Sequence, residues 1–420
     1  MFRCGNDSCL PSALLCDGYV DCPDGSDENS MMCTRRSSES VCDSDERMCG
    51  DGRCVPATAD CDTGEEGPCT WRSCSQVCIP KHAHNHTCKC LEGYKHRQLP
   101  DNTWSCEAIG EKAQAIVAVN GSLRAWELTK REKDSRVLYI AGDESTEITS
   151  ITTALVGNSW LVWWSDTSGK LSTIDATHAL QADSITVVRP PVRVIVQDTA
   201  IIRGVTFDWV SGRLYYTAVT KGGDGEGYSH GGYGAVYVCA PDGRRRVTLM
   251  RRKNAEPDDI LIHNATRQIF WSDRGATPGI MAAGLDGADP RWLVKRRVRR
   301  VTALALSTDR LYFVDAYYDT LESVKFDGSA RVVLATFAKR PAGAPALHLP
   351  SGIGNSTYKP FPVPTESCGR LAAWEEWLWC AGRRGLARLP RRPAAPAVAP
   401  RAALPVSALA VVHPQLCRAA

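Results

Sequence analysis

The sequence lacks three features that would narrow its function at once. No run of about 18 apolar residues occurs, so we expect no membrane-spanning helix within these 420 residues. No H-E-x-x-H and no glycine-rich phosphate loop leading into a helix is present, so we expect no enzyme. No basic and apolar leader precedes Cys4, so we expect no signal peptide, and we expect either a fragment of a longer protein or an incomplete gene model.

Cysteine is scarce over most of the chain and dense at its start. Fifteen of the 19 cysteines precede residue 107, and only Cys239, Cys368, Cys380 and Cys417 follow. This asymmetry divides the chain into a head that is stabilised by disulfides and a larger body with its own core. Such cysteine density indicates an oxidising, extracellular compartment.

Charge divides the chain in the same way. Residues 1–110 carry 18 Asp and Glu against 10 Lys and Arg (net −8), and the remainder carries 29 against 40 (net +11). An acidic head suits basic ligands, whereas a basic body could attract sulfated glycans, anionic lipid or the head itself. Nucleic acid is not an expected partner of a disulfide-rich secreted chain. Five sequons are candidate glycosylation sites: Asn6, Asn85, Asn120, Asn264 and Asn355.

Four carboxylates crowd into the string CDGYVDCPDGSDE. Asp17, Asp21, Asp27 and Glu28 fall within 12 residues, and they repel one another unless a cation neutralises them. Short acidic side chains supply the hard oxygen ligands that calcium takes. An EF-hand loop has the same length, but its sixth position needs glycine for a sharp turn and Cys22 stands there.

Residues 1–33 resemble a low-density-lipoprotein receptor class A module. The resemblance implies a calcium site formed by the four carboxylates and by the backbone carbonyls of Leu14 and Tyr19. It also implies a ligand-binding face at Leu14, Asp17 and Asp21, although the family usually has Trp at position 14, where the ring helps to hold a ligand lysine. The family pairing gives Cys4–Cys22 and Cys16–Cys33, which leaves Cys9 without a partner because a sixth cysteine is missing.

Two further cysteine-rich modules follow. Residues 42–61 resemble the first two-thirds of another class A module; its acidic half is missing, so we expect no second calcium site there. The family rule gives Cys42–Cys54, and Cys49–Cys61 pairs the cysteines left over. Residues 69–106 resemble an epidermal-growth-factor-like (EGF-like) module without a calcium motif. That resemblance implies three bridges: Cys69–Cys78, Cys74–Cys88 and Cys90–Cys106.

Three histidines lie close to cysteines in the third module. His82, His84 and His86 beside Cys88 and Cys90 have the residue types of a zinc site. The same cysteines are required for the expected bridges, so solvated histidines are the favoured interpretation.

The body from about residue 112 is a series of short apolar runs separated by Gly, Asp, Asn and Pro, which is typical of strands. A unit of two aromatics, a small residue and Asp recurs every 40 to 55 residues. Clear copies begin at Trp163, Phe270 and Tyr312; weaker copies are Tyr215-Tyr216-Thr217-Ala218 and Leu378-Trp379-Cys380-Ala381. Most units end in a D-G turn. Buried aromatics between neighbouring sheets, and small polar residues and Asp that bond to a neighbour's backbone, would explain the pattern.

This repeat resembles the YWTD six-bladed β-propeller. Five copies predict five blades, and the sixth would combine AIVAVN and LRAWEL near residues 115–128 with ALAVVHP at 408–414. We therefore expect a mostly β chain in which small disulfide-rich modules precede a propeller over 112–414. Residues 415–420 resemble the start of another module.

The order class A, EGF-like, propeller is similar to that of endocytic lipoprotein and vitellogenin receptors. The resemblance implies an extracellular segment that captures basic ligands, such as a lipoprotein or a yolk protein, through a calcium-organised module, with the propeller as scaffold and possible release element. It would lie at the outer face of the plasma membrane or in the endosome lumen, or be secreted if this is the whole product. The alternative is a matrix, adhesion or signalling co-receptor protein that uses its propeller face.

Overall fold

The computed structural model places some parts of the chain well enough to describe. Before residue 74 these are the short strands named below and residue 26; beyond it they are residues 74–82, 85–98, 104–128, 135–140, 146–181, 190–220, 232–307, 309–318, 320–336, 368–375, 377–382, 385–390 and 406–413. The chain separates into two compact units, residues 1–64 with 342–357 and residues 65–341 with 358–420. No helix of the described residues is long and apolar enough to cross a membrane.

The first unit contains two short antiparallel pairs. β1 (Phe2–Arg3) pairs with β2 (Cys9–Leu10), and β3 (Glu46–Met48) pairs with β4 (Cys54–Pro56). The second unit opens with two longer hairpins, β5 (Val77–His82) with β6 (Asn85–Lys89) and β7 (Tyr94–Gln98) with β8 (Trp104–Ala108).

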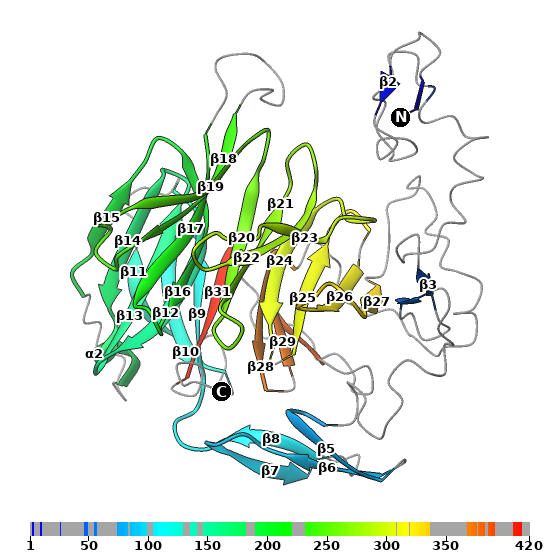
Figure 1. Ribbon diagram of the computed structural model, residues 1–420. Coiled ribbons are helices and arrows are strands. Elements are labelled where there is room, and N and C mark those ends of the chain that lie inside the picture. Colours follow the sequence, from blue (N-terminus) through cyan, green and yellow to red (C-terminus); the bar gives the residue numbers. More distant parts are fainter. Residues whose placement is uncertain are drawn as a thin grey trace. The chain divides into compact units, whose positions relative to one another are not determined.

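Six antiparallel sheets follow, each a blade of one ring (Figure 1). Blade 1 joins β9 (Gln114–Val119), β10 (Ser122–Glu127) and β11 (Arg136–Ile140) to β31 (Ala408–Val412). Blade 2 has β12 (Ile148–Val156), β13 (Ser159–Asp166), β14 (Lys170–Asp175) and β15 (Arg193–Gln197), with the short helix α2 (Thr177–Gln181) after β14. Blade 3 has β16 (Ile201–Asp208), β17 (Arg213–Val219), β18 (Tyr233–Cys239) and β19 (Val247–Lys253).

The remaining blades repeat this order. Blade 4 has β20 (Pro257–His263), β21 (Gln268–Asp273), β22 (Gly279–Gly284) and β23 (Arg291–Val294). Blade 5 has β24 (Val301–Leu306), β25 (Arg310–Asp315), β26 (Thr320–Lys325) and β27 (Val332–Thr336). In blade 6 the described strands are β28 (Arg370–Trp374), β29 (Trp377–Gly382) and β30 (Gly385–Pro390). The expected mostly β chain with a six-bladed propeller is confirmed.

The last strand closes the ring on the first. β31 pairs antiparallel with β9, and it contacts β28 of blade 6 on one side and β12 of blade 2 on the other. The inner strands β12, β16, β20, β24 and β28 contact one another in the same order around the axis. The C-terminal strand therefore completes blade 1 as its innermost strand, in the way the ALAVVHP segment suggested.

Each pair of adjacent aromatics serves two junctions between blades. Side chains alternate across a strand, so neighbours point to opposite faces of the sheet. Trp164 packs with blade 1, including Ile116, whereas Trp163 packs with blade 3 and stacks on Phe207 at 4.7 Å between ring centroids. In blades 3 to 5, too, the first aromatic of the pair packs toward the next blade and the second packs toward the preceding blade. The six apolar clusters correspond to the six junctions between blades.

Blade 6 corrects the register predicted for its motif. Trp379 packs toward blade 1 and Leu378 toward blade 5, which is the reverse of what a copy starting at Leu378 requires. The copy therefore starts at Trp379 and places Cys380 where other blades have their second aromatic. Cys380 is bonded to Cys368, and this disulfide fills the core between blades 5 and 6. The sequence hid this register because both Leu378 and Trp379 are acceptable core residues.

The small polar residue of the motif and its carboxylate have different roles. Thr217 Oγ1 accepts a hydrogen bond from Gly204 N in its own blade and donates one to the Asp258 carbonyl of the next blade, at 2.5 Å. By contrast, Asp273 accepts from the backbone N–H groups of Glu256 and Gly275, both in its own blade. The prediction that both residues bond to a neighbouring blade is thus right for Thr217 and wrong for Asp273, because the end of the second strand lies opposite the start of the first in the same sheet.

The D-G turns of blades 3, 4 and 5 each pack closely against the preceding blade. Gly243, Gly287 and Gly328 have φ of 83°, 83° and 91°, a region that L side chains rarely adopt. A Cβ at each would press on a backbone carbonyl of the preceding blade's outermost strand, which comes from Ile195, Leu249 or Leu293. Glycine is therefore needed there for both conformation and space.

We predict that removing residues 406–420 strongly destabilises the second unit. The truncation deletes β31 and its buried Leu409, Val411 and Val412, a loss of roughly 5 kcal/mol or more. Because a stable domain has about 5–15 kcal/mol in total, the midpoint of thermal unfolding should fall by at least about 10 °C. The control removes only 414–420 and keeps β31; a melt that is the same for both truncations would disprove the closure.

Candidate functional site

The predicted calcium site lies outside the described residues. This holds for Leu14, Asp17, Tyr19, Asp21, Asp27 and Glu28 alike, and for the bridges expected among Cys4, Cys16, Cys22, Cys33, Cys42, Cys49, Cys54 and Cys61 and the sequons at Asn6 and Asn355. Those assignments stay predictions.

The predicted EGF-like module, residues 69–106, has two disulfides in the described region. Cys74 is bonded to Cys88 and Cys90 to Cys106, which are pairings that the resemblance implied. Cys78 is also disulfide-bonded, although Cys69 lies outside the described residues. Ligand atoms of Cys74, Cys78 and His86 lie within 4.8 Å of one another, but both sulfurs are in disulfides. They cannot provide the thiolates that a zinc ion needs.

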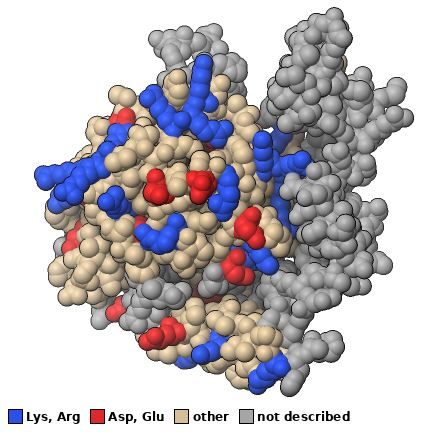
Figure 2. All heavy atoms as spheres, viewed as in Figure 1, with Lys and Arg blue, Asp and Glu red and all other residues tan. Residues whose placement is uncertain are grey.

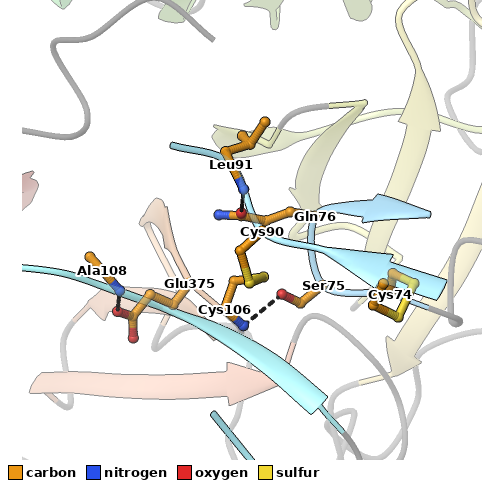
Figure 3. Close-up of a disulfide and its surroundings, with 9 residues drawn as sticks. Cys74, Ser75, Gln76, Cys90, Leu91, Cys106, Ala108 and Glu375 are labelled. Carbon is orange, nitrogen blue, oxygen red and sulfur yellow. Dashed lines mark hydrogen bonds between the residues drawn. A yellow bond between two sulfur atoms is a disulfide. The ribbon is translucent and has the colours of Figure 1, made fainter. Parts of the chain in front are cut away.

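The EGF-like module is bonded directly to blade 6. Ala108 N, at the end of β8, donates to Glu375 Oε1 at 3.1 Å, and Glu375 lies in the turn between β28 and β29 (Figure 3). Within the module, Cys106 N donates to Ser75 Oγ at 2.9 Å and Leu91 N to Gln76 Oε1 at 2.7 Å. These bonds hold the end of β8 both to the rest of its module and to blade 6. The module is therefore attached directly to the propeller.

A second contact secures the same junction from the other end of the chain. His413 is buried directly after β31, and its Nε2 lies 2.7 Å from the Glu111 carbonyl in the segment that connects β8 to β9. The ring of His413 packs on Trp374 of blade 6 at 4.6 Å between centroids. Closing the ring and anchoring the EGF-like module therefore depend on the same few residues, which sequence reasoning did not single out.

Arg370 joins the blades at the axis of the ring. Its Nε and one terminal nitrogen donate to the Thr149 carbonyl at 3.0 and 2.9 Å, and the other terminal nitrogen donates to the Thr302 carbonyl at 2.9 Å. The guanidinium also reaches the Arg203 carbonyl at 3.5 Å and lies 3.7 Å from Asp258 Oδ1. One side chain of β28 thus contacts the inner strands of blades 2 to 5.

Opposite charges make this burial tolerable. Burial disfavours the charged form of Arg370, but Asp258 and Asp259 outweigh it and raise its pKa. Burial raises the pKa of Asp259, although Arg370 and the Leu304 N–H, which donates to Asp259 Oδ2 at 2.9 Å, oppose the shift. Arg274 lies 3.3 Å from Asp258 Oδ2 and adds a second cation. Salt bridges and hydrogen bonds to the backbone occupy Arg370, Asp258 and Asp259. The arrangement therefore suits a structural role, in which these side chains hold the inner strands together.

Three sequons lie in the described region. Asn85 and Asn120 are exposed, each in or beside a hairpin. Asn264 is half-buried, and in the amide orientation that satisfies its hydrogen bonds it donates to Asp208 Oδ1 at 2.9 Å and accepts from Trp209 Nε1 at 2.7 Å. A glycan on the Asn264 nitrogen would have to disturb these contacts, so Asn85 and Asn120 are the better candidates.

Burial also shifts the pKa values of a half-buried histidine and a buried cysteine of the propeller. His263 packs on Phe326 at 4.2 Å, and burial lowers its pKa although Asp309 opposes the shift. Cys239 is a free, buried cysteine in the junction between blades 2 and 3, and burial raises the pKa of its thiol to about 11.

We predict that Arg370→Leu lowers the free energy of unfolding by about 3–5 kcal/mol, because it removes the counter-charge of Asp259 and leaves Asp258 with Arg274 alone. Denaturant unfolding measures the change, with Arg213→Leu as the control for an exposed arginine. Adding Asp258→Asn to Arg370→Leu should recover part of the loss. Equal effects of Arg370→Leu and Arg213→Leu would contradict this structural role.

We also predict a contribution of His263 to stability at neutral pH. Its pKa in the folded protein is below the ordinary value of 6.5, so the unfolded chain binds the proton more readily. The contribution is present above pH ~6.5 and is lost as pH falls toward the folded pKa. The drop in melting temperature between pH 7.4 and 5.5 should therefore be smaller for His263→Gln than for the wild type. His178→Gln, at an exposed histidine, is the control; equal drops in all three proteins would refute the prediction.

Comparisons with known proteins agree with this architecture. Residues 1–33 match the low-density lipoprotein receptor domain class A family. A stretch of 151 residues is 27% identical to the vitellogenin receptor of Solenopsis invicta, covering 35% of this chain and 8% of that protein. The vitellogenin receptor Yl of Drosophila melanogaster is 28% identical over 111 residues, 26% of this chain and 6% of its own length.

Two more similarities are with a human protein and with a solved structure. The human low-density lipoprotein receptor-related protein 5-like protein is 27% identical over 132 residues, 31% of this chain and 48% of that protein. A chain of a nidogen/laminin complex superposes with a TM-score of 0.53 at 13% identity, covering 71% of this chain and 98% of that one, which establishes the fold alone. The chain spans less than half the length of each of these sequence relatives. The chain thus combines a class A match over residues 1–33, similarity to vitellogenin receptors and to a low-density lipoprotein receptor-related protein 5-like protein, and a six-bladed propeller fold.

Proposed function

We propose that this chain is an extracellular ligand-binding segment of an endocytic receptor of the lipoprotein or vitellogenin type. The observation that carries the proposal is the class A match over residues 1–33, which contain Asp17, Asp21, Asp27 and Glu28. A calcium ion held by these carboxylates would order a module too small to build a core. The acidic surface that remains would bind basic side chains of a protein ligand.

The choice of ligand class rests on charge and on the relatives. The first 110 residues have a net charge of −8, which favours a basic partner through electrostatic complementarity. Two of the relatives are vitellogenin receptors by name, so a yolk protein or lipoprotein is the ligand we propose. We place the segment on the outer face of the plasma membrane or in the endosome lumen, as part of a longer receptor, with no catalytic role.

The propeller would act as a scaffold in this proposal. A hydrogen bond from Ala108 N to Glu375 Oε1 fixes the end of the predicted EGF-like module on the propeller. A single intact calcium motif would bind a ligand weakly, so useful affinity would need further modules acting together.

We expect one calcium ion per chain, bound through the four carboxylates. In isothermal calorimetry on the full chain, Asp27→Ala should abolish this site, because losing one ligand leaves the other carboxylates in uncompensated repulsion. Calcium-dependent capture by immobilised polylysine, a stand-in for a basic ligand, should disappear in the same variant.

Asp24→Ala is the matched control, since Asp24 lies in the same acidic string but outside the proposed ligand set. It should retain both calcium binding and capture. Two equal calcium sites, or normal calcium binding by Asp27→Ala, would rule out the proposed site.

A further inference from the structure

The connection between blades 4 and 5 contains a paired-basic motif. Residues 297–300 read Arg-Val-Arg-Arg and lie between β23 and β24. The spacing Arg-x-Arg-Arg occurs once in the 420 residues. Serine endoproteases with acidic specificity pockets cut directly after such a motif, because each pocket takes one guanidinium. Figure 2 shows Lys and Arg side chains at several separate places on the described face of the propeller, so the spacing singles out this connection and basic residues alone do not.

In the folded chain, the peptide bond that would be cut after this motif is protected. The Arg300 carbonyl accepts a hydrogen bond from Ala316 N at 2.8 Å, and Arg300 N donates to Asp315 Oδ1 at 3.2 Å. Val301, directly after the bond, is 1% exposed and begins β24. A protease has to surround the bond that it cuts, so it cannot act on this one while β24 is in place.

The backbone before the bond is also held in a shape that a protease does not bind. Arg297 has a φ of 48°, in the left-handed region, whereas proteases hold the residues before the cut in an extended conformation with negative φ. Val298 is 4% exposed and packs into the apolar cluster between blades 4 and 5. The buried Arg331 donates to the carbonyls of Arg296 and Arg297 at 2.7 and 3.0 Å. Recognition therefore requires that these contacts open first.

The contacts that must open are local ones. β23 has four residues, which makes it the shortest strand of the described blades. It is the outermost strand of blade 4, and it is paired with β22 through three residues. Short segments at the edge of a fold open at a lower free energy than the whole domain. We therefore expect β23 and the connection after it to detach more often than the ring unfolds.

We propose that the bond between Arg300 and Val301 is a latent processing site, which a serine endoprotease specific for paired basic residues cuts only when the junction between blades 4 and 5 is open. The bond is hydrolysed: water supplies the hydroxyl of the new Arg300 carboxyl group and a proton of the new Val301 amine. The cut separates blades 1 to 4 from blades 5 and 6 and from β31, so the ring is no longer closed by one unbroken chain. The site thereby removes chains in which this junction has not formed, and it does not rest on the proposed receptor function.

The test incubates the full chain with the convertase furin at a fixed calcium concentration, and it identifies the product by N-terminal sequencing and by size on a reducing gel. Val298→Ala is the opening variant, because it removes the apolar anchor at the unspecified position of the motif and keeps all three arginines. Val205→Ala is the matched control, at a valine that is 3% exposed in the junction between blades 2 and 3. We expect Val298→Ala to be cut about tenfold faster than the wild type, because more of the chain is open. The product should begin at Val301, and Val205→Ala should stay within about twofold of the wild type.

A second pair of variants opens the same connection in another way. Asp315→Asn weakens the bonds from Arg299 N and Arg300 N, and Asp166→Asn changes the corresponding motif carboxylate in blade 2. Cleavage should accelerate in Asp315→Asn and not in Asp166→Asn. Adding Arg300→Gln, at an exposed side chain, to Val298→Ala should stop cleavage at this bond and leave the melting temperature unchanged.

Four outcomes would overturn the proposal. Cleavage of the folded wild type as fast as that of the reduced and alkylated chain would mean that the bond is not protected. No cleavage of the reduced and alkylated chain after Arg300 would mean that the motif is not recognised. No acceleration in either Val298→Ala or Asp315→Asn would mean that the junction does not open locally. Equal acceleration in the two blade 2 and blade 3 controls would mean that unfolding of the whole ring, and not of this junction, exposes the site.

Discussion

The propeller depends on the closure of a ring. Each blade is a small sheet that cannot bury both faces alone, so it needs a neighbour on either side. The six apolar clusters supply those contacts, and the two clusters that flank blade 1 are complete only when β31 lies beside β9. Closure therefore ties together strands that are almost 300 residues apart in sequence. It also makes stability a property of the whole ring.

Arg370 adds a second constraint at the axis. A single guanidinium bonds to carbonyls on inner strands of several blades, where water has little access, and Asp258 and Asp259 balance its charge. Such a buried ion network contributes little net stability compared with apolar packing, but its geometry is demanding. The directional bonds of Arg370 require the inner strands to keep one relative position, which apolar packing alone enforces less strictly.

Much of the fold could be predicted from the sequence, because it follows from local patterns. Paired aromatics, D-G turns and the spacing of repeats indicated the blades, and the C-terminal strand fitted the incomplete first blade. The register of blade 6 could not be predicted, since Leu378, Trp379 and Cys380 all suit a buried strand and only the packing tells them apart. Arg370, Glu375 and His413 carried no signal because their partners are distant in sequence. The calcium ligands rest on the spacing of the class A motif alone.

The buried thiol of Cys239 has a consequence for how the chain matures. The thiolate is the form that attacks disulfides, and at a pKa of about 11 almost none is present at physiological pH. Once blades 2 and 3 have packed together, this cysteine is kept from exchanging with the bridges of the small modules. Before that point it is an unshielded nucleophile in an oxidising compartment, beside many cysteines that must find their own partners. Early assembly of this junction would therefore protect the fidelity of disulfide formation in the small modules that precede the propeller in sequence.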